Sequence, residues 1–187
     1  VGDRGVSRLD NMVGYNFRLG EIECAIGIEQ LKKLEKLIAS RQKLAARLTQ
    51  GVSGLEGLRT PVVKQNCSHV YYVYPLVFDE AEAGCQRASI ARALAAEGVN
   101  MATTYQNVHL LPMYQEKIAF GSKGVPWTAD FCKREVSYEK GICPVAESMN
   151  DEKYLGFGFC VYDLDDDDID QIVYAFHKVW DDRSSLD

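Results

Sequence analysis

Residues 14–31 read GYNFRLGEIECAIGIEQL and pass from an irregular lead-in to a helical pattern. From Leu19 to Gln50 the apolar residues step by three and four, which is the period of an amphipathic helix. The apolar positions are Ile22, Ala25, Ile26, Leu31, Leu34, Ile38, Leu44, Ala45 and Leu48. Gly51 stands where such a helix would end. The stretch therefore predicts one long helix that faces the core from Leu19 onward.

Two polar residues, Asn16 and Arg18, stand just before this helix. In one interpretation Asn16 caps or turns the backbone and Arg18 pairs with Glu21 or Glu23. In the other interpretation the amide and the guanidinium bind an anion such as phosphate, beside the free N–H groups of the helix. The local residues favour the first interpretation and leave the second open.

The rest of the chain alternates between strand-like and helix-like segments. Strands are expected at 69–79, 100–105 and 154–163, and helices at 85–97, 130–139 and 165–181. Pro75 indicates an edge position or a bulge in the first of these strands. The resulting order of elements, starting from the long helix, predicts an α/β fold around a small sheet.

The composition is that of a globular chain with a substantial core. Of 187 residues, 47% are hydrophobic and 26% are charged, and the net charge is −6. This acidic balance argues against a general binder of nucleic acid or of anionic membranes. The sequence has no apolar run of about 18 residues that would cross a membrane. Its first residues are polar, lack an initiator Met and resemble a loop, so we expect a piece of a longer protein.

Six cysteines are scattered along the chain without a CxxC pair or a zinc-type spacing. They are Cys24, Cys67, Cys85, Cys132, Cys143 and Cys160. This pattern favours reduced, structural thiols in a cytoplasmic protein. A Cys–His nucleophile pair stays open as a minor alternative, because its members need only be close in space.

The most acidic stretch, DLDDDDID at residues 163–170, has two interpretations. A calcium-binding loop counted from Asp163 would need Gly at its sixth position and Glu at its twelfth, where this chain has Asp168 and Tyr174. Carboxylates in the first turn of a helix cap free N–H groups and complement the helix dipole. The stretch therefore predicts a helix start rather than a metal site.

His109 differs from the other two histidines in its surroundings. It lies in the irregular, proline-containing stretch YQNVHLLPMY between Tyr105 and Tyr114, and loops on a rigid scaffold often carry sites. His69 and His177 are expected to be surface or packing residues. Local features leave a site role for His109 open.

Several segments together resemble the DegT–StrS family of pyridoxal-phosphate sugar aminotransferases. The lead-in and helix GYNFRLGEIECAIGIEQL resemble the family's G-Y-N-x-R element, and TTYQNVHLLPMY resembles its H-L-x-P-x-Y element. SYEKGICPVAES and DDDDIDQIVYAFHKVW are similar to the last segments of these enzymes. The resemblance covers nearly the whole chain, in the same order, and corresponds to the C-terminal half of a fold-type I aminotransferase.

The resemblance implies a fold and a domain organisation. The fold is α/β, with a long N-terminal helix and a small, mostly antiparallel sheet packed with helices. Residues 1–20 would be the end of the large domain with an active-site loop, 21–50 a long connecting helix, and 51–187 the small C-terminal domain.

The resemblance also implies a function. Such enzymes are homodimers with sites at the subunit interface, and they move an amino group, usually from glutamate, to a keto sugar attached to a nucleotide. Asn16 would bind the phosphate of pyridoxal phosphate in the partner subunit's site. Tyr15 and Arg18 would place the loop or the substrate, and His109 would lie near the site.

The family's Schiff-base lysine and the carboxylate that pairs with the pyridinium nitrogen lie upstream of the G-Y-N-x-R element. Only 13 residues precede Gly14, so we expect no catalytic residue and no internal aldimine in this chain alone. Two alternatives stay open. The chain could be a non-catalytic α/β module for binding or dimerisation, or part of a related sugar dehydratase in which a histidine replaces the lysine.

Overall fold

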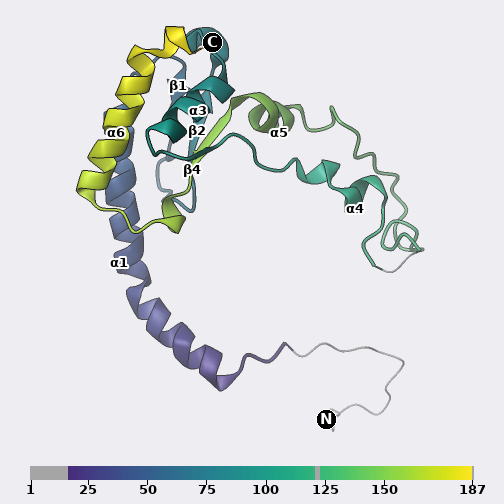
Figure 1. The fold of residues 1–187 in the computed structure, drawn as a ribbon. Coiled ribbons are helices and arrows are strands. Elements are labelled where there is room, and N and C mark those ends of the chain that lie inside the picture. The colour runs from purple at the N-terminus through teal and green to yellow at the C-terminus, as the bar shows by residue number, and fades with distance from the viewer. Residues whose placement is uncertain (1–16, 121–122, 187) are drawn as a thin grey trace. The chain divides into compact units, whose positions relative to one another are not determined.

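The computed structural model describes residues 17–120 and 123–186 (Figure 1). Contacts divide the chain into two compact units, Val1–Ile38 and Ala39–Asp187. The long helix α1 (Glu21–Val52) begins in the first unit and ends in the second. It confirms the predicted long helix, although both ends lie two residues further along the chain than predicted. Each unit is described separately.

The part of α1 in the first unit exposes its apolar side chains. The most exposed are Ile22, Leu31 and Ile26, at 77%, 67% and 57%. The prediction that the helix faces a core from Leu19 onward is therefore wrong for this part of the described chain. The apolar period shows which face of a helix is suited to burial, but the covering surface has to come from elsewhere.

The second part of α1 is buried on one face. Leu44, Ala45 and Leu48 lie in the core as predicted. Gly51 does not end the helix, which continues to Val52. A Cβ atom at Gly51 would lie 2.4 Å from Cγ2 of Val173, so glycine is needed for the close approach of the neighbouring helix α6 (Asp166–Asp181).

The second unit contains a four-stranded antiparallel sheet in the order β1-β2-β4-β3. Its strands are β1 (Leu58–Arg59), β2 (Tyr74–Phe78), β3 (Met101–Ala102) and β4 (Tyr154–Phe157). The central pair sets Leu76 opposite Leu155. This arrangement confirms the predicted fold class of a long helix and a small antiparallel sheet packed with helices.

The strands are shorter than predicted, for local reasons. β2 begins only at Tyr74, because Tyr71 has a φ of +50°, outside the conformations of a strand. β1 was not predicted, since two residues show no alternation. β1 pairs only with Val77 and Phe78 of β2. On that side of β2, no described strand pairs with Pro75. The predicted edge position or bulge is therefore wrong for β2, which lies between β1 and β4, and Pro75 is tolerated because β1 ends before it reaches this position.

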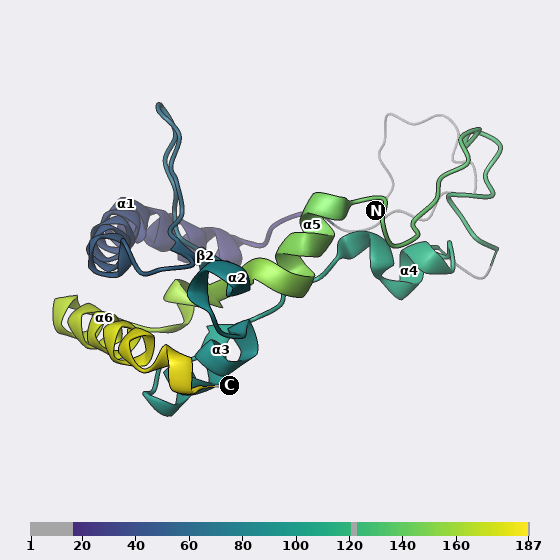
Figure 2. The same cartoon turned by 90° about the horizontal axis from the view of Figure 1, so that it is seen from above.

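The connection between β1 and β2, residues 60–73, stands out from the sheet as an extended loop (Figure 2). Its N-terminal residues include Val62, which is 89% exposed. Near its end, the backbone N–H of Tyr71 donates to Nδ1 of His69 (2.9 Å), and the two rings pack together. His69 is thus a packing residue, as predicted.

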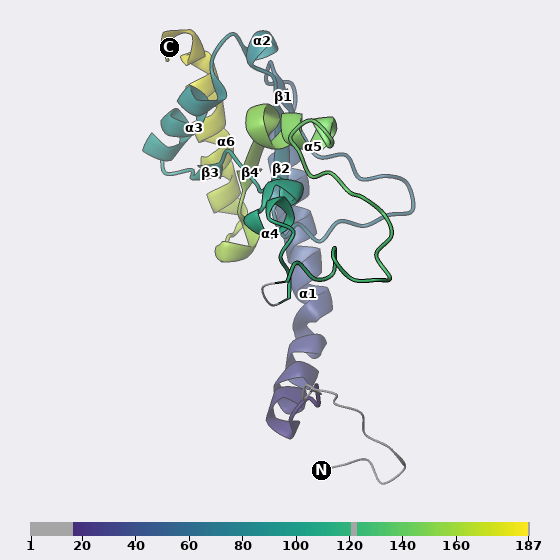
Figure 3. The ribbon, with the colours of Figure 1, turned by 90° about the vertical axis from the view of Figure 1, so that its right-hand side faces the viewer.

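Helices cover the sheet and connect its strands. In the described part of the second unit they are α2 (Glu80–Ala83), α3 (Arg87–Ala96), α4 (Pro112–Gln115), α5 (Pro144–Ser148) and α6. Shorter helical turns are η1 (Val108–Leu110), η2 (Met149–Lys153), η3 (Phe159–Val161) and η4 (Arg183–Ser185). Helices α3 and α6 lie side by side (Figure 3) and confirm the helices predicted at 85–97 and 165–181.

The helix predicted at 130–139 is wrong. This segment contains a turn and an irregular stretch, and Phe131 is exposed. The ring of Tyr138 packs instead against Tyr114 and Trp127, and its carbonyl accepts a hydrogen bond from Gln115 (2.6 Å). These contacts between distant residues hold the backbone in a path that local propensity does not encode.

The core joins α1, the sheet, α3 and α6. Tyr74 is fully buried, and its hydroxyl lies 2.6 Å from Oγ1 of Thr49 on α1. Burial raises the pKa of Tyr74 to about 12, against a smaller lowering by the Thr49 hydrogen bond. The phenol is therefore neutral at physiological pH. His177 on α6 is exposed, and its Nε2 lies 2.8 Å from the carbonyl oxygen of Gly51, so it is a surface histidine, in agreement with the prediction.

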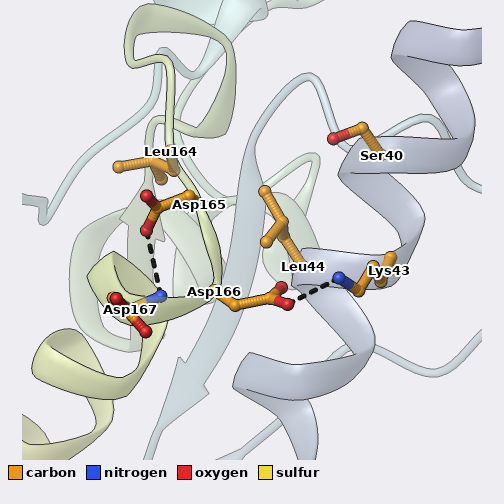
Figure 4. Close-up of a pocket in the computed structure, with 7 residues that line it drawn as sticks. All are labelled: Ser40, Lys43, Leu44, Leu164, Asp165, Asp166 and Asp167. Atoms are coloured by element: carbon orange, nitrogen blue, oxygen red, sulfur yellow. Dashed lines mark hydrogen bonds and ion pairs between the residues drawn. The ribbon is translucent and has the colours of Figure 1, made fainter.

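The acidic run begins α6, as predicted. Asp165 accepts hydrogen bonds from the backbone N–H groups of Asp167 and Asp168, and Asp168 accepts one in return from the N–H of Asp165. Figure 4 shows this helix start beside Lys43 of α1, whose Nζ lies 2.6 Å from a carboxylate oxygen of Asp166. A cavity of about 350 Å³ lies between them.

Replacing Asp165 with alanine should destabilise the protein by about 1 kcal/mol, because two N–H groups of α6 lose their acceptor. Urea denaturation measures this change as a lower midpoint at unchanged slope. The control is Asp163→Ala, since Asp163 is exposed and precedes the cap. Equal midpoints for the two variants would contradict the capping role.

Candidate functional site

The predicted site residues fall into three groups. Tyr15 and Asn16 lie outside the described residues. Arg18 lies in the exposed lead-in to α1, in the first unit. His109 belongs to the second unit, in the turn η1. The described geometry therefore concerns the surroundings of His109.

His109 forms a close pair with Glu147 of α5. Its Nε2 atom lies 2.9 Å from Oε1 of Glu147, and the two side chains are only 10% and 9% exposed. The sequence reasoning did not single out Glu147. A single acidic residue in the short segment PVAES gives no periodic signal, and only the tertiary contact with a residue 38 positions away reveals its role.

The Glu147 carboxylate also organises the loop before α5. The backbone N–H of Gly141 lies 2.8 Å from both oxygens of Glu147, and the N–H of Cys143 donates to Oε1 (3.1 Å). Burial raises the pKa of Glu147, but the hydrogen bonds from Gly141, Cys143 and His109 lower it by more, so the pKa lies below its usual value. The carboxylate is therefore ionised at neutral pH.

A polar network flanks this pair. The side chain of Asn107 donates to Asp151 (3.0 Å) and accepts from Asn150 (2.8 Å), while Lys140 donates to the other oxygen of Asp151 (2.7 Å). The hydrogen bond from Lys140 is the main cause that lowers the pKa of Asp151. The network ties the segment before η1 to η2.

An aromatic cluster packs the segment that follows His109. The rings of Tyr114, Trp127 and Tyr138 contact one another, and the indole N–H of Trp127 donates to the hydroxyl of Tyr138 (3.0 Å). Beside the cluster lies an open cleft of about 530 Å³, lined by Tyr114, Gln115, Lys117 and residues 135–139. The cluster gives the otherwise irregular segment a fixed structure near His109.

None of the lysines, all of which lie in the described part of the chain, is buried. Several form ion pairs with carboxylates, such as Lys140 with Asp151 and Lys178 with Glu97, and these carboxylates raise the pKa of both amines. A Schiff-base lysine requires the opposite environment, one that favours the neutral amine. Lys140 and Lys178 therefore do not fit the covalent attachment of pyridoxal phosphate.

The described residues show neither a helix long and apolar enough to cross a membrane nor a cluster of metal-ligating side chains. Cys24 and Cys67 are exposed, whereas Cys85 is buried. Among the described residues, the candidate site side chains are Arg18 and the His109–Glu147 pair.

A long helix that enters a small antiparallel α/β domain is the architecture of the C-terminal part of a fold-type I aminotransferase. The chain belongs to the DegT/DnrJ/EryC1/StrS aminotransferase family, whose model matches residues 3–154. This match includes the lead-in to α1, His109 and Glu147.

Two curated relatives are similar to most of this chain. The uncharacterized protein MJ1066 of Methanocaldococcus jannaschii is 30% identical over 76% of the chain. The spore coat polysaccharide biosynthesis protein SpsC of Bacillus subtilis is 26% identical over 89% of it. The chain spans 36% and 38% of the lengths of these two relatives.

Solved structures share the fold. DesV of S. venezuelae, determined with a ketimine intermediate, matches 94% of this chain with a TM-score of 0.67 and 21% identity. PseC of Helicobacter pylori, an aminotransferase involved in the biosynthesis of pseudoaminic acid, matches 96% with a TM-score of 0.63 and 18% identity. The chain covers 40% and 42% of these two structures.

Proposed function

We propose that this chain is part of a pyridoxal-phosphate-dependent aminotransferase that acts on a nucleotide-linked keto sugar, with glutamate as the amino donor. The supporting observation is that one family match spans both the GYNFR lead-in and the HLLP element, in their family order. The relatives SpsC and PseC, named for polysaccharide and pseudoaminic acid biosynthesis, support a sugar substrate.

The chain's own residues would bind and orient rather than react. Pyridoxal phosphate, when bound, supplies an electron sink for the transfer of the amino group. Asn16 would donate its amide N–H to the cofactor phosphate in the partner subunit's site of a homodimer. Arg18, an exposed guanidinium in the same loop, fits the recognition of an anionic group, and Tyr15 would help to place the loop or the substrate.

The same proposal assigns a role to each part of the chain. Residues 1–20 would carry the active-site loop, residues 21–50 the connecting helix, and residues 51–187 the small domain with His109 on the substrate side. The reactive lysine would come from a segment that precedes these residues in the protein. We place the enzyme in the cytoplasm, where nucleotide-linked sugars are substrates.

The full-length protein tests this function. Purified with pyridoxal phosphate, it should absorb at about 400–430 nm and give a lysine adduct with borohydride, mapped by mass spectrometry outside residues 1–187. With glutamate and a nucleotide-linked keto sugar, it should form 2-oxoglutarate and an amino sugar. The matched control is the protein with that mapped lysine changed to alanine, which should form neither.

Two outcomes would contradict the proposal. A full-length protein that gives no borohydride adduct and binds no sugar substrate would favour the non-catalytic module. A protein that binds the cofactor, forms no amino sugar and removes a hydroxyl group from the sugar would favour the related dehydratase.

A further inference from the structure

We propose that Glu147 is a positioning residue of this aminotransferase site: it fixes the imidazole of His109 so that Nδ1 is the nitrogen offered to the substrate. The inference rests on the proposed function for the presence of a substrate near His109. The tautomer and the fixed orientation of the His109 ring are inferred from the hydrogen bonds of Glu147 and His109.

The first step is the tautomer of His109. Glu147 is ionised and can only accept hydrogen bonds, so Nε2, at 2.9 Å from its Oε1, has to carry the proton. This holds for both the neutral and the charged imidazole. Nδ1 is thus an acceptor in the neutral ring and a second donor in the charged ring.

The second step is the access to Nδ1. Among the described residues no hydrogen bond occupies Nδ1, and it is not one of the buried polar atoms that lack a partner. Nδ1 is therefore not fully buried, although the His109 side chain as a whole is only 10% exposed. A ring with one nitrogen paired to a buried carboxylate, and the other not fully buried and without a hydrogen-bond partner among the described residues, is suited to contact a ligand.

The third step is the rigidity of the pair. Three backbone contacts from Gly141 and Cys143 hold the Glu147 carboxylate, and Gly141 has a φ of +104°, which favours glycine. On the other side, the amide of Gln115 donates to the carbonyl of His109 (2.7 Å). The Glu147 carboxylate and the His109 backbone are therefore each held by their own hydrogen bonds. The hydrogen bond between Glu147 and Nε2 then sets the orientation of the His109 ring.

The test uses full-length protein with 15N-labelled histidine, together with Glu147→Gln, His109→Asn and the double variant. Glu152→Gln is the control, because Glu152 is an exposed glutamate five residues away. In the wild type, the 15N spectrum should show a proton on Nε2 and none on Nδ1 of the neutral His109 ring. Loss of the signal in His109→Asn assigns it. Glu147→Gln should populate the other tautomer, since its carboxamide N–H₂ can donate to Nε2.

Kinetics test the action of Glu147 through His109. Each single variant should lower kcat/KM for the sugar at least about tenfold, because small misplacements of a binding group cost up to about a hundredfold. The double variant should be no slower than His109→Asn, whereas Glu152→Gln should match the wild type. Circular dichroism and the cofactor absorbance of each variant report folding separately.

Several results would overturn the inference while the proposed function stands. They are a proton on Nδ1 in the neutral wild-type ring, full activity of His109→Asn, and additive losses in the double variant. A wild-type protein that transaminates no sugar would instead refute the proposed function. In that case the 15N spectrum would still show whether Glu147 fixes the tautomer of the His109 ring.

Discussion

Replacing Phe176 with alanine should destabilise the protein by about 3–5 kcal/mol, the largest effect of a single substitution that we expect here. Phe176 on α6 is 1% exposed and stacks on Trp180, with ring centroids 5.7 Å apart. Trp180 in turn forms a T-shaped ring pair with Phe78 in β2. The substitution removes a ring from the contact between α6 and the sheet and leaves a cavity that packed neighbours fill only in part. Urea denaturation measures the loss as a lower midpoint.

Tyr174→Ala is the matched control on the same helix. Tyr174 is 69% exposed, so its loss should change the free energy of unfolding by less than about 0.5 kcal/mol. If both variants unfold at the same urea concentration, α6 does not pack on the sheet through the face that contains Phe176.

Replacing Asn16 with alanine should weaken the binding of pyridoxal phosphate to the full-length protein by about 10- to 150-fold. This range corresponds to the loss of one hydrogen bond to a charged group, about 1.5–3 kcal/mol. Asn16→Asp should weaken binding further, because a carboxylate would repel the phosphate. Titration of the cofactor-free protein, followed by absorbance, measures both dissociation constants.

Asn100→Ala is the control, since Asn100 is an exposed residue of the second unit. It should bind the cofactor as the wild type does. An unchanged dissociation constant for Asn16→Ala would contradict the assigned phosphate contact and return Asn16 to the alternative role of a backbone cap.

Local patterns predicted the elements whose signals are contained in one segment. The acidic run predicted the start of α6 because the capping carboxylates and the N–H groups they bind lie within four residues of one another. The period of apolar residues predicted α1, α3 and α6 for the same reason. The helix predicted at 130–139 failed because contacts between distant residues override local preference there. The strand predicted at 69–79 was too long because the backbone at Tyr71, with its positive φ, leaves the extended conformation.

The same distinction between local signals and contacts of distant residues applies to the candidate site. Residue types and the resemblance to a family made Asn16, Arg18 and His109 candidates for a site. Glu147 could not be predicted, because its role depends on a contact between α5 and η1, and the two residues in contact lie 38 positions apart in the sequence. A single glutamate carries no pattern before that contact forms.

For α1, the order of residues along the chain was sufficient to specify a long amphipathic helix and the face that is apolar. It was not sufficient to specify burial: Leu44, Ala45 and Leu48 are covered, whereas Ile22, Ile26 and Leu31 are exposed in their unit. Helical period is a local property, set by hydrogen bonds between residues four apart. Burial, the need for glycine at position 51 and the pairing of His109 with Glu147 depend on which distant surfaces meet, and only the tertiary structure decides that.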